Sequence, residues 1–263
     1  MIIKIILIFL NYRVYMIDVT VEKKENLTKR KRYRTEVSRV YPSDKRSSFH
    51  ELESCFLGIS LSNHHFTPLK LESVLKWISK RFDSCTLLVG DSIHRLNLIH
   101  LSSSLTEQAC LDQALDMGRQ YIEQAQVIID RLNLPTTFQF IRCSEIQTTD
   151  LYMSYYQSLQ ALYSEELSFK NSVISSAIQF QKIAPVVITK IEDTPQVQSS
   201  IQYFLEEFAI FACLFDQKLP VMLYPGAFTI LDEVVDGQHP QAPSALRDLI
   251  IVSLRFKGIS SMV

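Results

Sequence analysis

The chain has 263 residues, of which 47% are hydrophobic and 21% charged, and its net charge at pH 7 is −1. This length allows one substantial hydrophobic core, or one domain with an extension, and the composition excludes a disordered or fibrous protein. The five cysteines are scattered, with no CxxC pair and no nearby cluster of histidines. Their spacing argues against a zinc site and a disulfide framework, and it favours a reducing, cytoplasmic location.

The first ten residues are strongly apolar, but we expect them to form neither a membrane anchor nor a signal peptide. A spanning helix needs about 20 apolar residues, and Asn11, Arg13 and Asp18 interrupt this run. A signal peptide has positive charge first and small residues at a cleavage site, whereas Lys4 lies inside the apolar run and no Ala-x-Ala follows. Met16 is an alternative start of translation.

A basic arm follows at residues 23–46. It contains ten lysines and arginines against three acidic residues, a net charge of +7, while residues 47–263 carry −8. A basic arm on a mildly acidic body favours a polyanionic partner, because the neutralisation of phosphates is driven by charge. A disordered solubilising tail or a membrane-surface tail is the alternative. We expect residues 1–48 to be a flexible N-terminal extension and residues 49–263 to form one folded domain.

Four short, continuous apolar runs in this body predict β-strands that are buried on both faces. They lie at residues 55–60, 84–90, 136–142 and 219–224. Apolar residues at helical spacing predict helices over about 69–81, 107–133, 150–167, 171–183 and 195–216. Alternating strands and helices predict an α/β fold with a mostly parallel sheet. The remaining apolar segment, 243–256, is ambiguous between a last helix and a strand.

The chain has only six glycines, and no two of them lie within four residues of each other. A dinucleotide fingerprint and a P-loop both need closely spaced glycines, so that backbone amides can approach phosphates. We therefore expect neither ATP nor a dinucleotide cofactor to bind by these routes. Any bond that the protein forms would draw on a substrate that arrives already activated.

Polar residues at two strand ends and on one helix mark a candidate site. Ser60 and Tyr224 end the first and the last of the predicted strands, and the carboxyl ends of parallel strands open onto one crevice. Tyr203 and Glu207 lie four residues apart and share one face of a helix. Because this helix is apolar nearly all round, we expect Glu207 to be desolvated and to bind a cation, and its neighbour Glu206 to be solvated. A polar loop follows the strand at 84–90 and faces the same crevice, with Asp91, His94, Arg95 and Asn97.

A serine hydrolase is one alternative for this site. The segment Gly58-Ile59-Ser60-Leu61-Ser62 differs from the hydrolase elbow G-x-S-x-G in its last position. A hydrolase also needs a histidine later in the chain, for which His239 is a candidate. Ser60 can also simply end a strand and cap the following turn, as serine commonly does.

Taken together, these residues resemble the cyclodipeptide synthase family. The resemblance runs from about Phe56 to Leu254, and its motifs are Gly58-Ile59-Ser60 with Phe66 close behind, Gly90-Asp91 with His94 and Asn97, Tyr203-x-x-x-Glu207, and Tyr224-Pro225. It implies a single Rossmann-like domain similar to the catalytic domains of class I aminoacyl-tRNA synthetases, without their ATP-binding motifs. The family takes two aminoacyl groups from two aminoacyl-tRNAs and releases a cyclic dipeptide. The implied partners are therefore two aminoacyl-tRNAs, used in turn, and we expect a monomer without cofactor.

The resemblance also implies roles for individual residues. Ser60 would attack the aminoacyl ester and hold the first residue as an acyl-enzyme, in ping-pong catalysis. Tyr203 and Glu207 would bind its ammonium group, and Tyr224 would assist proton transfer during ring closure. The side chain of the first amino acid, which we expect to be hydrophobic, would occupy a pocket near Phe56, Gly58, Ile210 and Met222. Arg119 and Arg131 lie on the helix at 107–133, where the family has a basic helix that contacts tRNA, but two arginines among five acidic residues make a poor phosphate track. Our own hypothesis is that the basic arm supplies the missing charge through Lys29, Arg30, Lys31, Arg32 and Arg34.

The chain departs from the family pattern in one respect. One branch of the family has Asn three residues after the serine and Tyr-His at the later strand end, and the other has Tyr-Pro and usually lacks that Asn. This chain combines Asn63 with Tyr224-Pro225. We assign it to the Tyr-Pro branch, because the later pair is less easily reached by drift at one position, and this puts a substrate-positioning role of Asn63 in doubt. A tRNA- or RNA-binding protein without catalytic activity, on the same fold, is the second alternative.

Overall fold

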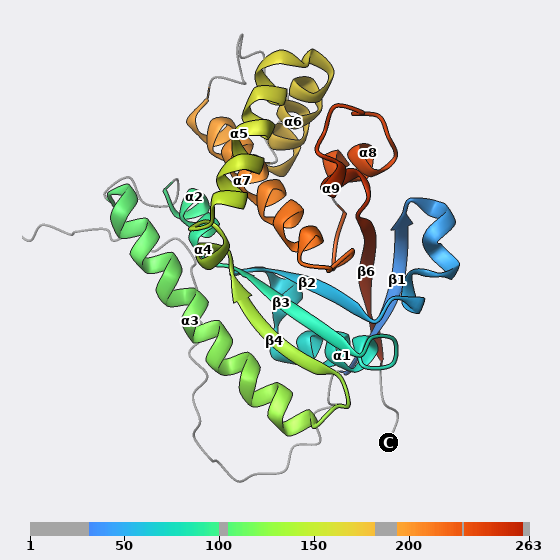
Figure 1. Cartoon of the computed structure of the whole chain (residues 1–263). Coiled ribbons are helices and arrows are strands. Elements are labelled where there is room, and N and C mark those ends of the chain that lie inside the picture. The colour runs from blue at the N-terminus through green and yellow to red at the C-terminus, as the bar shows by residue number, and fades with distance from the viewer. Residues whose placement is uncertain (1–31, 100–104, 182–193, 228, 260–263) are drawn as a thin grey trace, which may run out of the picture.

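The computed structural model describes residues 32–99, 105–181, 194–227 and 229–259. Its centre is a six-stranded sheet in the order β1-β6-β5-β2-β3-β4 (Figure 1). The strands are β1 (Arg32–Tyr41), β2 (Ser54–Ser60), β3 (Ser84–Gly90), β4 (Thr137–Arg142), β5 (Val221–Tyr224) and β6 (Ile250–Ile259). All neighbouring pairs are parallel except β1 and β6, which are antiparallel. The predicted α/β fold with a mostly parallel sheet is confirmed.

Helices cover both faces of the sheet (Figure 1). One face packs against α5 (Asp150–Glu165), α6 (Leu167–Phe180), α7 (Pro195–Asp216), α8 (Thr229–Val235) and α9 (Ser244–Arg247), and the other against α1 (Pro68–Ile78) and α3 (Glu107–Leu132). Two further short helices, α2 (Arg95–Leu98) and α4 (Cys143–Ile146), follow β3 and β4. Successive side chains of a strand point to opposite faces, so Phe56 of β2 packs with the α7 layer and Leu57 with the α1 layer.

The ends of the long helices follow from local sequence signals. The Thr106 hydroxyl accepts a hydrogen bond from the amide of Ala109 and so caps the start of α3. Asn133, in the left-handed conformation with φ of 43°, ends the same helix. Pro195 occupies the first turn of α7, where its missing N–H leaves no helical bond unmade.

The elements that the sequence predicts within the body are present. The four predicted strands correspond to β2, β3, β4 and β5, each within two residues at both ends. The five predicted helices correspond to α1, α3, α5, α6 and α7, with the largest difference at the start of α6, four residues earlier than expected. The ambiguous segment 243–256 contains the short helix α9 and then enters β6.

The basic arm differs from the prediction. Residues 32–41, expected in a flexible extension before residue 49, form the edge strand β1 and pair with β6 from Arg32 opposite Ile259 to Tyr41 opposite Ile251. The pairing is possible because polar and apolar residues alternate along β1, so that Thr35 and Val40 are buried while Arg32 and Arg34 face solvent. The arm's remaining residues up to 31, and the apolar N-terminal run, lie outside the described residues.

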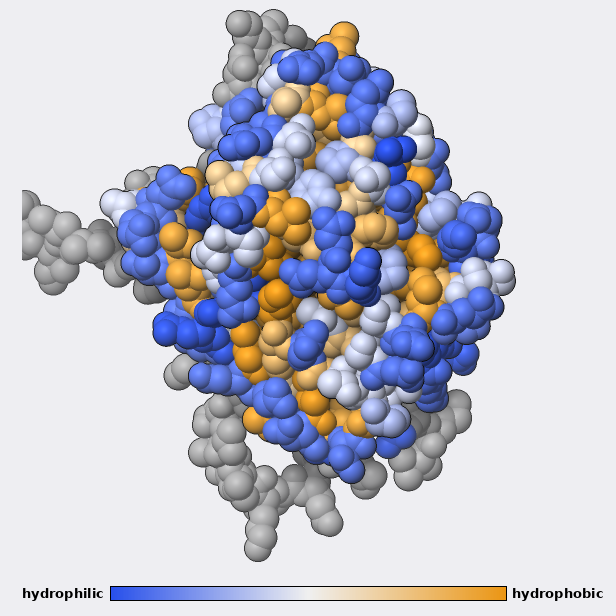
Figure 2. Space-filling model, in the orientation of Figure 1, coloured by the Kyte–Doolittle hydropathy of each residue, from blue (hydrophilic) through white to orange (hydrophobic). Residues whose placement is uncertain are grey.

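Hydrophilic residues dominate the face of the molecule in Figure 2, and hydrophobic residues show in strips between them. Within the described part of the chain, no helix combines the length and the apolar character that a membrane span requires. All five cysteines are buried and none forms a disulfide.

Candidate active site

The four residues expected to carry the chemistry line one cavity. Ser60 and Tyr224 stand at the carboxyl ends of β2 and β5, and Tyr203 and Glu207 reach the same space from α7. The cavity has a volume of about 410 Å³. Its wall also includes residues that sequence analysis did not single out, namely Ser176, Gln179 and Phe180 of α6 and Thr229 and Ile230 of α8.

Ser60 and Tyr224 are in direct contact. The Ser60 Oγ lies 3.0 Å from the Tyr224 hydroxyl oxygen, and the Asn63 amide donates to that hydroxyl at 3.2 Å. The Asn63 carbonyl in turn accepts from the amide of His65 at 2.9 Å, which fixes the orientation of the Asn63 side chain. Burial raises the pKa of Tyr224, and its hydrogen bonds to Ser60 and Asn63 oppose this shift. Asn63 therefore orients the Tyr224 hydroxyl.

Glu207 is a buried carboxyl group that forms no ion pair with another described residue. The Tyr203 hydroxyl donates to its Oε1 at 3.2 Å, and both side chains are 7% exposed. Burial raises the pKa of Glu207 to about 8, although the bond from Tyr203 lowers it, and burial also raises the pKa of Tyr203. A cation that enters the cavity would favour the ionised form of Glu207, so the pair is suited to bind an ammonium group.

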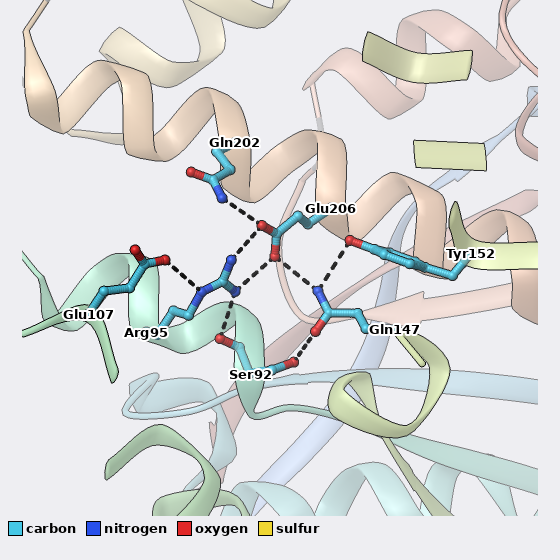
Figure 3. A network of polar contacts seen from close by, with 7 residues as sticks. All are labelled: Ser92, Arg95, Glu107, Gln147, Tyr152, Gln202 and Glu206. Atoms are coloured by element: carbon cyan, nitrogen blue, oxygen red, sulfur yellow. Dashed lines mark hydrogen bonds and ion pairs between the residues drawn. The ribbon is translucent and has the colours of Figure 1, made fainter. Parts of the chain in front are cut away.

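Glu206 is not solvated, contrary to the prediction. It is 3% exposed and holds Arg95 of α2 through two hydrogen bonds, of 2.9 and 2.7 Å (Figure 3). Gln147 and Gln202 donate to the same carboxylate at 2.9 and 2.8 Å. Although burial alone would lower the pKa of Arg95, its hydrogen bonds and the charges of Glu206 and Glu107 raise it. The sequence neighbours of Glu206 gave no sign of this partner, which is 111 positions away.

The polar loop after β3 is partly structural and partly in the site. Asp91 is fully buried and accepts hydrogen bonds from the amides of Ser92 and Ser144 and from the Ser144 hydroxyl, so it ties the ends of β3 and β4 together. Asn97 lines the cavity. His94 lies 3.4 Å from the Asn97 amide, and burial lowers its pKa to about 4, which keeps it neutral.

The residues expected to hold the side chain of the first amino acid do not line the cavity. Phe56, Ile210 and Met222 are fully buried in the core and do not line the cavity. Gly58 borders a smaller void behind Ser60, whose other walls include Leu88, Cys143, Phe211 and Tyr224. A Cβ at Gly58 would lie 3.5 Å from the Tyr224 ring, so the glycine leaves room beside the strand end.

His239, the candidate histidine of a hydrolase, does not line the cavity. No histidine among the described residues lines it. His239 lies 3.2 Å from a carboxylate oxygen of Glu233 and packs edge-on against Phe169. Within the same residues, no group of three histidine, cysteine or acidic side chains is arranged to hold a metal ion.

The cations expected to contact tRNA fall into two groups. On α3, Arg119 and Arg131 are exposed, but each is paired with a carboxylate, that of Asp116 at 2.9 Å and that of Glu72 at 2.7 Å. On β1, Arg32 and Arg34 are exposed at the sheet edge. Lys29, Arg30 and Lys31 lie outside the described residues.

Comparison with known proteins gives matches among solved structures. No protein-family model and no curated protein matches the chain. A cyclodipeptide synthase from Fluoribacter dumoffii matches with a TM-score of 0.70 and 20% identity, over 87% of this chain and 100% of that one. A second, from Staphylococcus haemolyticus, gives 0.65 and 14% over 86% and 100%. The chain has the cyclodipeptide synthase fold.

Other structures with this fold extend the comparison. A cyclodipeptide synthase from Candidatus Glomeribacter gigasporarum, bound to Phe-tRNAPhe, matches with a TM-score of 0.58 and 15% identity over 80% of this chain and 89% of that one. A Mycobacterium tuberculosis protein whose structure relates cyclodipeptide synthetases to type I tRNA synthetases matches with 0.62 and 14%, over 79% and 87%. The expected likeness to synthetase catalytic domains is therefore confirmed at the level of fold.

Proposed function

We propose that this protein is a tRNA-dependent cyclodipeptide synthase that uses two aminoacyl-tRNAs in turn. The observation that carries the proposal is the meeting of Ser60, Tyr224, Tyr203 and Glu207 on one cavity, within a fold shared with cyclodipeptide synthases. Two strand ends and one helix contribute these side chains, so their meeting is a property of the fold rather than of local sequence.

The first step is the transfer of an aminoacyl group to Ser60. The Ser60 oxygen attacks the ester carbonyl, a bond to the serine forms, the bond to the ribose oxygen breaks, and the serine proton ends on the released tRNA hydroxyl. The Tyr224 hydroxyl, 3.0 Å from Ser60 Oγ, is within reach to pass this proton. Glu207 and Tyr203 hold the α-ammonium group of the bound residue.

The second step needs that ammonium group as a free amine. Glu207, with its pKa raised to about 8, is matched to an α-amino group, whose pKa is about 8, and so can accept its proton. The amine then attacks the ester of the second aminoacyl-tRNA, and a dipeptidyl ester on Ser60 forms as the tRNA hydroxyl leaves. The amine of the second residue attacks the Ser60 ester, which closes the ring and releases the serine.

A hydrophobic first amino acid is part of this proposal, and the aromatic side chains of Phe180, Phe204 and Phe208 on the cavity wall support it. As part of the same proposal we assign the chain to the Tyr-Pro branch, on Tyr224-Pro225.

The test is expression of the chain in a bacterial host, with mass spectrometry of the medium for new cyclic dipeptides. We expect products from the wild type and from Ser154→Ala, a change at an exposed serine of α5, and none from Ser60→Ala. Folded wild-type protein without product that still binds tRNA would favour the non-catalytic alternative. Turnover of simple esters without tRNA would instead favour a hydrolase.

A further inference from the structure

A network of polar side chains, called here the clamp, joins the active-site helix α7 to α2, α4 and α5 (Figure 3). Arg95 of α2 donates to the two carboxylate oxygens of Glu206 on α7 at 2.9 and 2.7 Å. Gln147, at the end of α4, donates to Glu206 at 2.9 Å and to the Tyr152 hydroxyl of α5 at 3.3 Å. The Ser92 hydroxyl, in the turn after β3, donates to the side-chain oxygen of Gln147. The clamp therefore ties the segments after β3 and β4 to α7.

The clamp restricts how α7 can turn about its own axis. Arg95 and Glu206 are 13% and 4% exposed in their side chains, and each oxygen of Glu206 accepts from two donors, since Gln202 supplies the fourth bond at 2.8 Å. Such bonds weaken steeply when their angles change. The apolar contacts that cover most of α7 have no preferred direction. We therefore expect the clamp, more than the apolar core, to set the rotation of this helix.

Both α2 and α7 contribute to the wall of the cavity. Asn97 lies two residues after Arg95 on α2, and Tyr203 and Glu207 come from α7. Glu207 follows Glu206 directly, and consecutive residues of an α-helix point about 100° apart. The direction of Glu206 toward Arg95 therefore determines the direction of Glu207 toward the cavity.

A small turn of α7 would displace the groups that hold the substrate. The side chains of an α-helix reach about 5–6 Å from its axis, so a rotation of about 10° moves a carboxylate by about 1 Å. A displacement of this size can cost about 10²-fold in rate. Tyr203 and Glu207 are bonded to each other at 3.2 Å on the same helix and would move together, so their bond cannot correct the error.

The clamp acts at a distance from the substrate. Arg95, Gln147, Gln202 and Glu206 are not among the residues that line the cavity. Any effect that they have on the reaction must therefore pass through the position of α2 and α7.

We propose that Arg95 and Glu206 are positioning residues for the reaction at Ser60, and that the clamp places Tyr203 and Glu207 against the aminoacyl group. The inference rests on the proposed function. It gives a reason for a charged pair at this place, because a pair of apolar side chains in the interior is often as stable as an ion pair or more stable. Lysine is not equivalent to Arg95, since only a guanidinium group donates to both carboxylate oxygens in a fixed fork.

The test separates position from stability. The clamp variant, Arg95→Met with Glu206→Leu, removes both charges and keeps apolar volume in their place, so its Tm should stay within about 5 °C of the wild type. The control variant, Arg142→Met with Glu145→Leu, removes an ion pair of 2.9 Å that joins β4 to α4 and does not include α7.

Both variants are assayed in the full chain, at a temperature where each is folded, for the formation of cyclic dipeptides from aminoacyl-tRNA. We expect the clamp variant to lower kcat by about 10²-fold and to leave KM within about threefold, because the cavity holds only the aminoacyl end of the substrate. The control variant should keep both parameters.

The substitution Arg95→Lys is a second test that does not depend on the folding of the double variant. It keeps the positive charge and loses the fork. A role in stability alone predicts full activity for this variant, whereas positioning predicts a kcat lower by about tenfold with Tm close to that of the wild type.

The outcomes separate this inference from the proposed function. Folded clamp and Arg95→Lys variants with kcat within about twofold of the wild type would overturn the inference. If the wild type makes no product, an NMR titration of the Glu207 carboxyl carbon reports its position instead, since the pKa of Glu207 depends on its burial and on its bond from Tyr203. The clamp variant removes equal and opposite charges, so a changed pKa of Glu207 in this variant alone would support the clamp and refute only the catalytic proposal. The same pKa in the wild type and both double variants would overturn the clamp as well.

Discussion

The substitution Arg95→Ala tests the buried ion pair beneath the active-site helix. Arg95 donates through both terminal nitrogens to the two oxygens of Glu206, and the exposed fractions of the two side chains are 13% and 4%. The pair joins α2 to α7 one residue before Glu207 (Figure 3). The substitution leaves a carboxylate in the interior with no cation to balance it.

The expected loss follows from the contacts that remain. Removal of one partner of a buried ion pair costs about 3–5 kcal/mol. Gln147 and Gln202 still donate to Glu206, so we expect a value near the lower end, ~3 kcal/mol. For a domain of this size such a loss lowers Tm by roughly 6–12 °C. The double substitution Arg95→Met with Glu206→Leu removes both charges and should recover most of the loss.

The assay is urea denaturation followed by circular dichroism, with thermal denaturation as a second measurement. Glu206→Gln is the matched control, because it keeps the shape and two hydrogen-bond partners and should cost less than Arg95→Ala. A free energy of unfolding for Arg95→Ala within about 1 kcal/mol of the wild type would refute the assignment of a buried, coupled pair. So would a double variant as unstable as the single one.

Three further predictions concern the site and its support. Folding raises the pKa of Glu207 from 4.5 to about 8, so the contribution of its neutral form to stability is fully present below pH 4.5 and is lost as pH rises through 8. Glu207→Gln should remove this pH dependence of the unfolding free energy, which amounts to at most ~5 kcal/mol. Curves of unfolding free energy against pH that run parallel for the variant and the wild type would contradict the burial argument. Tyr224→Phe removes the hydroxyl that bonds Ser60 and should lower the rate of product formation by roughly 10²-fold with Tm nearly unchanged; an unaltered rate would exclude a role in proton transfer. Gly118→Ala places a Cβ 2.6 Å from the Asp91 Cβ and should cost about 2 kcal/mol, measured by denaturation, and a neutral result would mean that α3 can shift away from β3.

The sequence predicted the inner strands well because both of their faces are buried. β2 and β3 are continuous apolar runs, and such runs leave few alternatives once helices flank them. The edge strand β1 was missed because its exposed face carries Arg32, Arg34 and Glu36, and these charges were interpreted as a solvated arm. Pairing with β6, more than 200 positions away, gives no signal in the local sequence.

In the candidate site, too, some residues could be predicted from the sequence and others could not. Strand ends alone could bring Ser60 and Tyr224 together, whereas Tyr203 and Glu207 were placed beside them through the family resemblance. The burial of Glu206 could not be predicted, because its partner Arg95 comes from another element and a lone glutamate next to a buried one is usually exposed. The α6 residues of the cavity wall were likewise missed, since nothing in their spacing marks them as facing a strand end.

The pairing of β1 with β6 limits how far the N-terminus can be trimmed. A chain that starts at residue 48 lacks β1 and leaves Val252 and Leu254 on an uncovered strand, and an uncovered strand recruits other chains by edge-to-edge pairing. Loss of activity in such a shortened protein would then report aggregation, not the absence of basic residues. A deletion of residues 1–31 keeps β1 paired with β6. It therefore separates the effect of losing basic residues from the effect of aggregation.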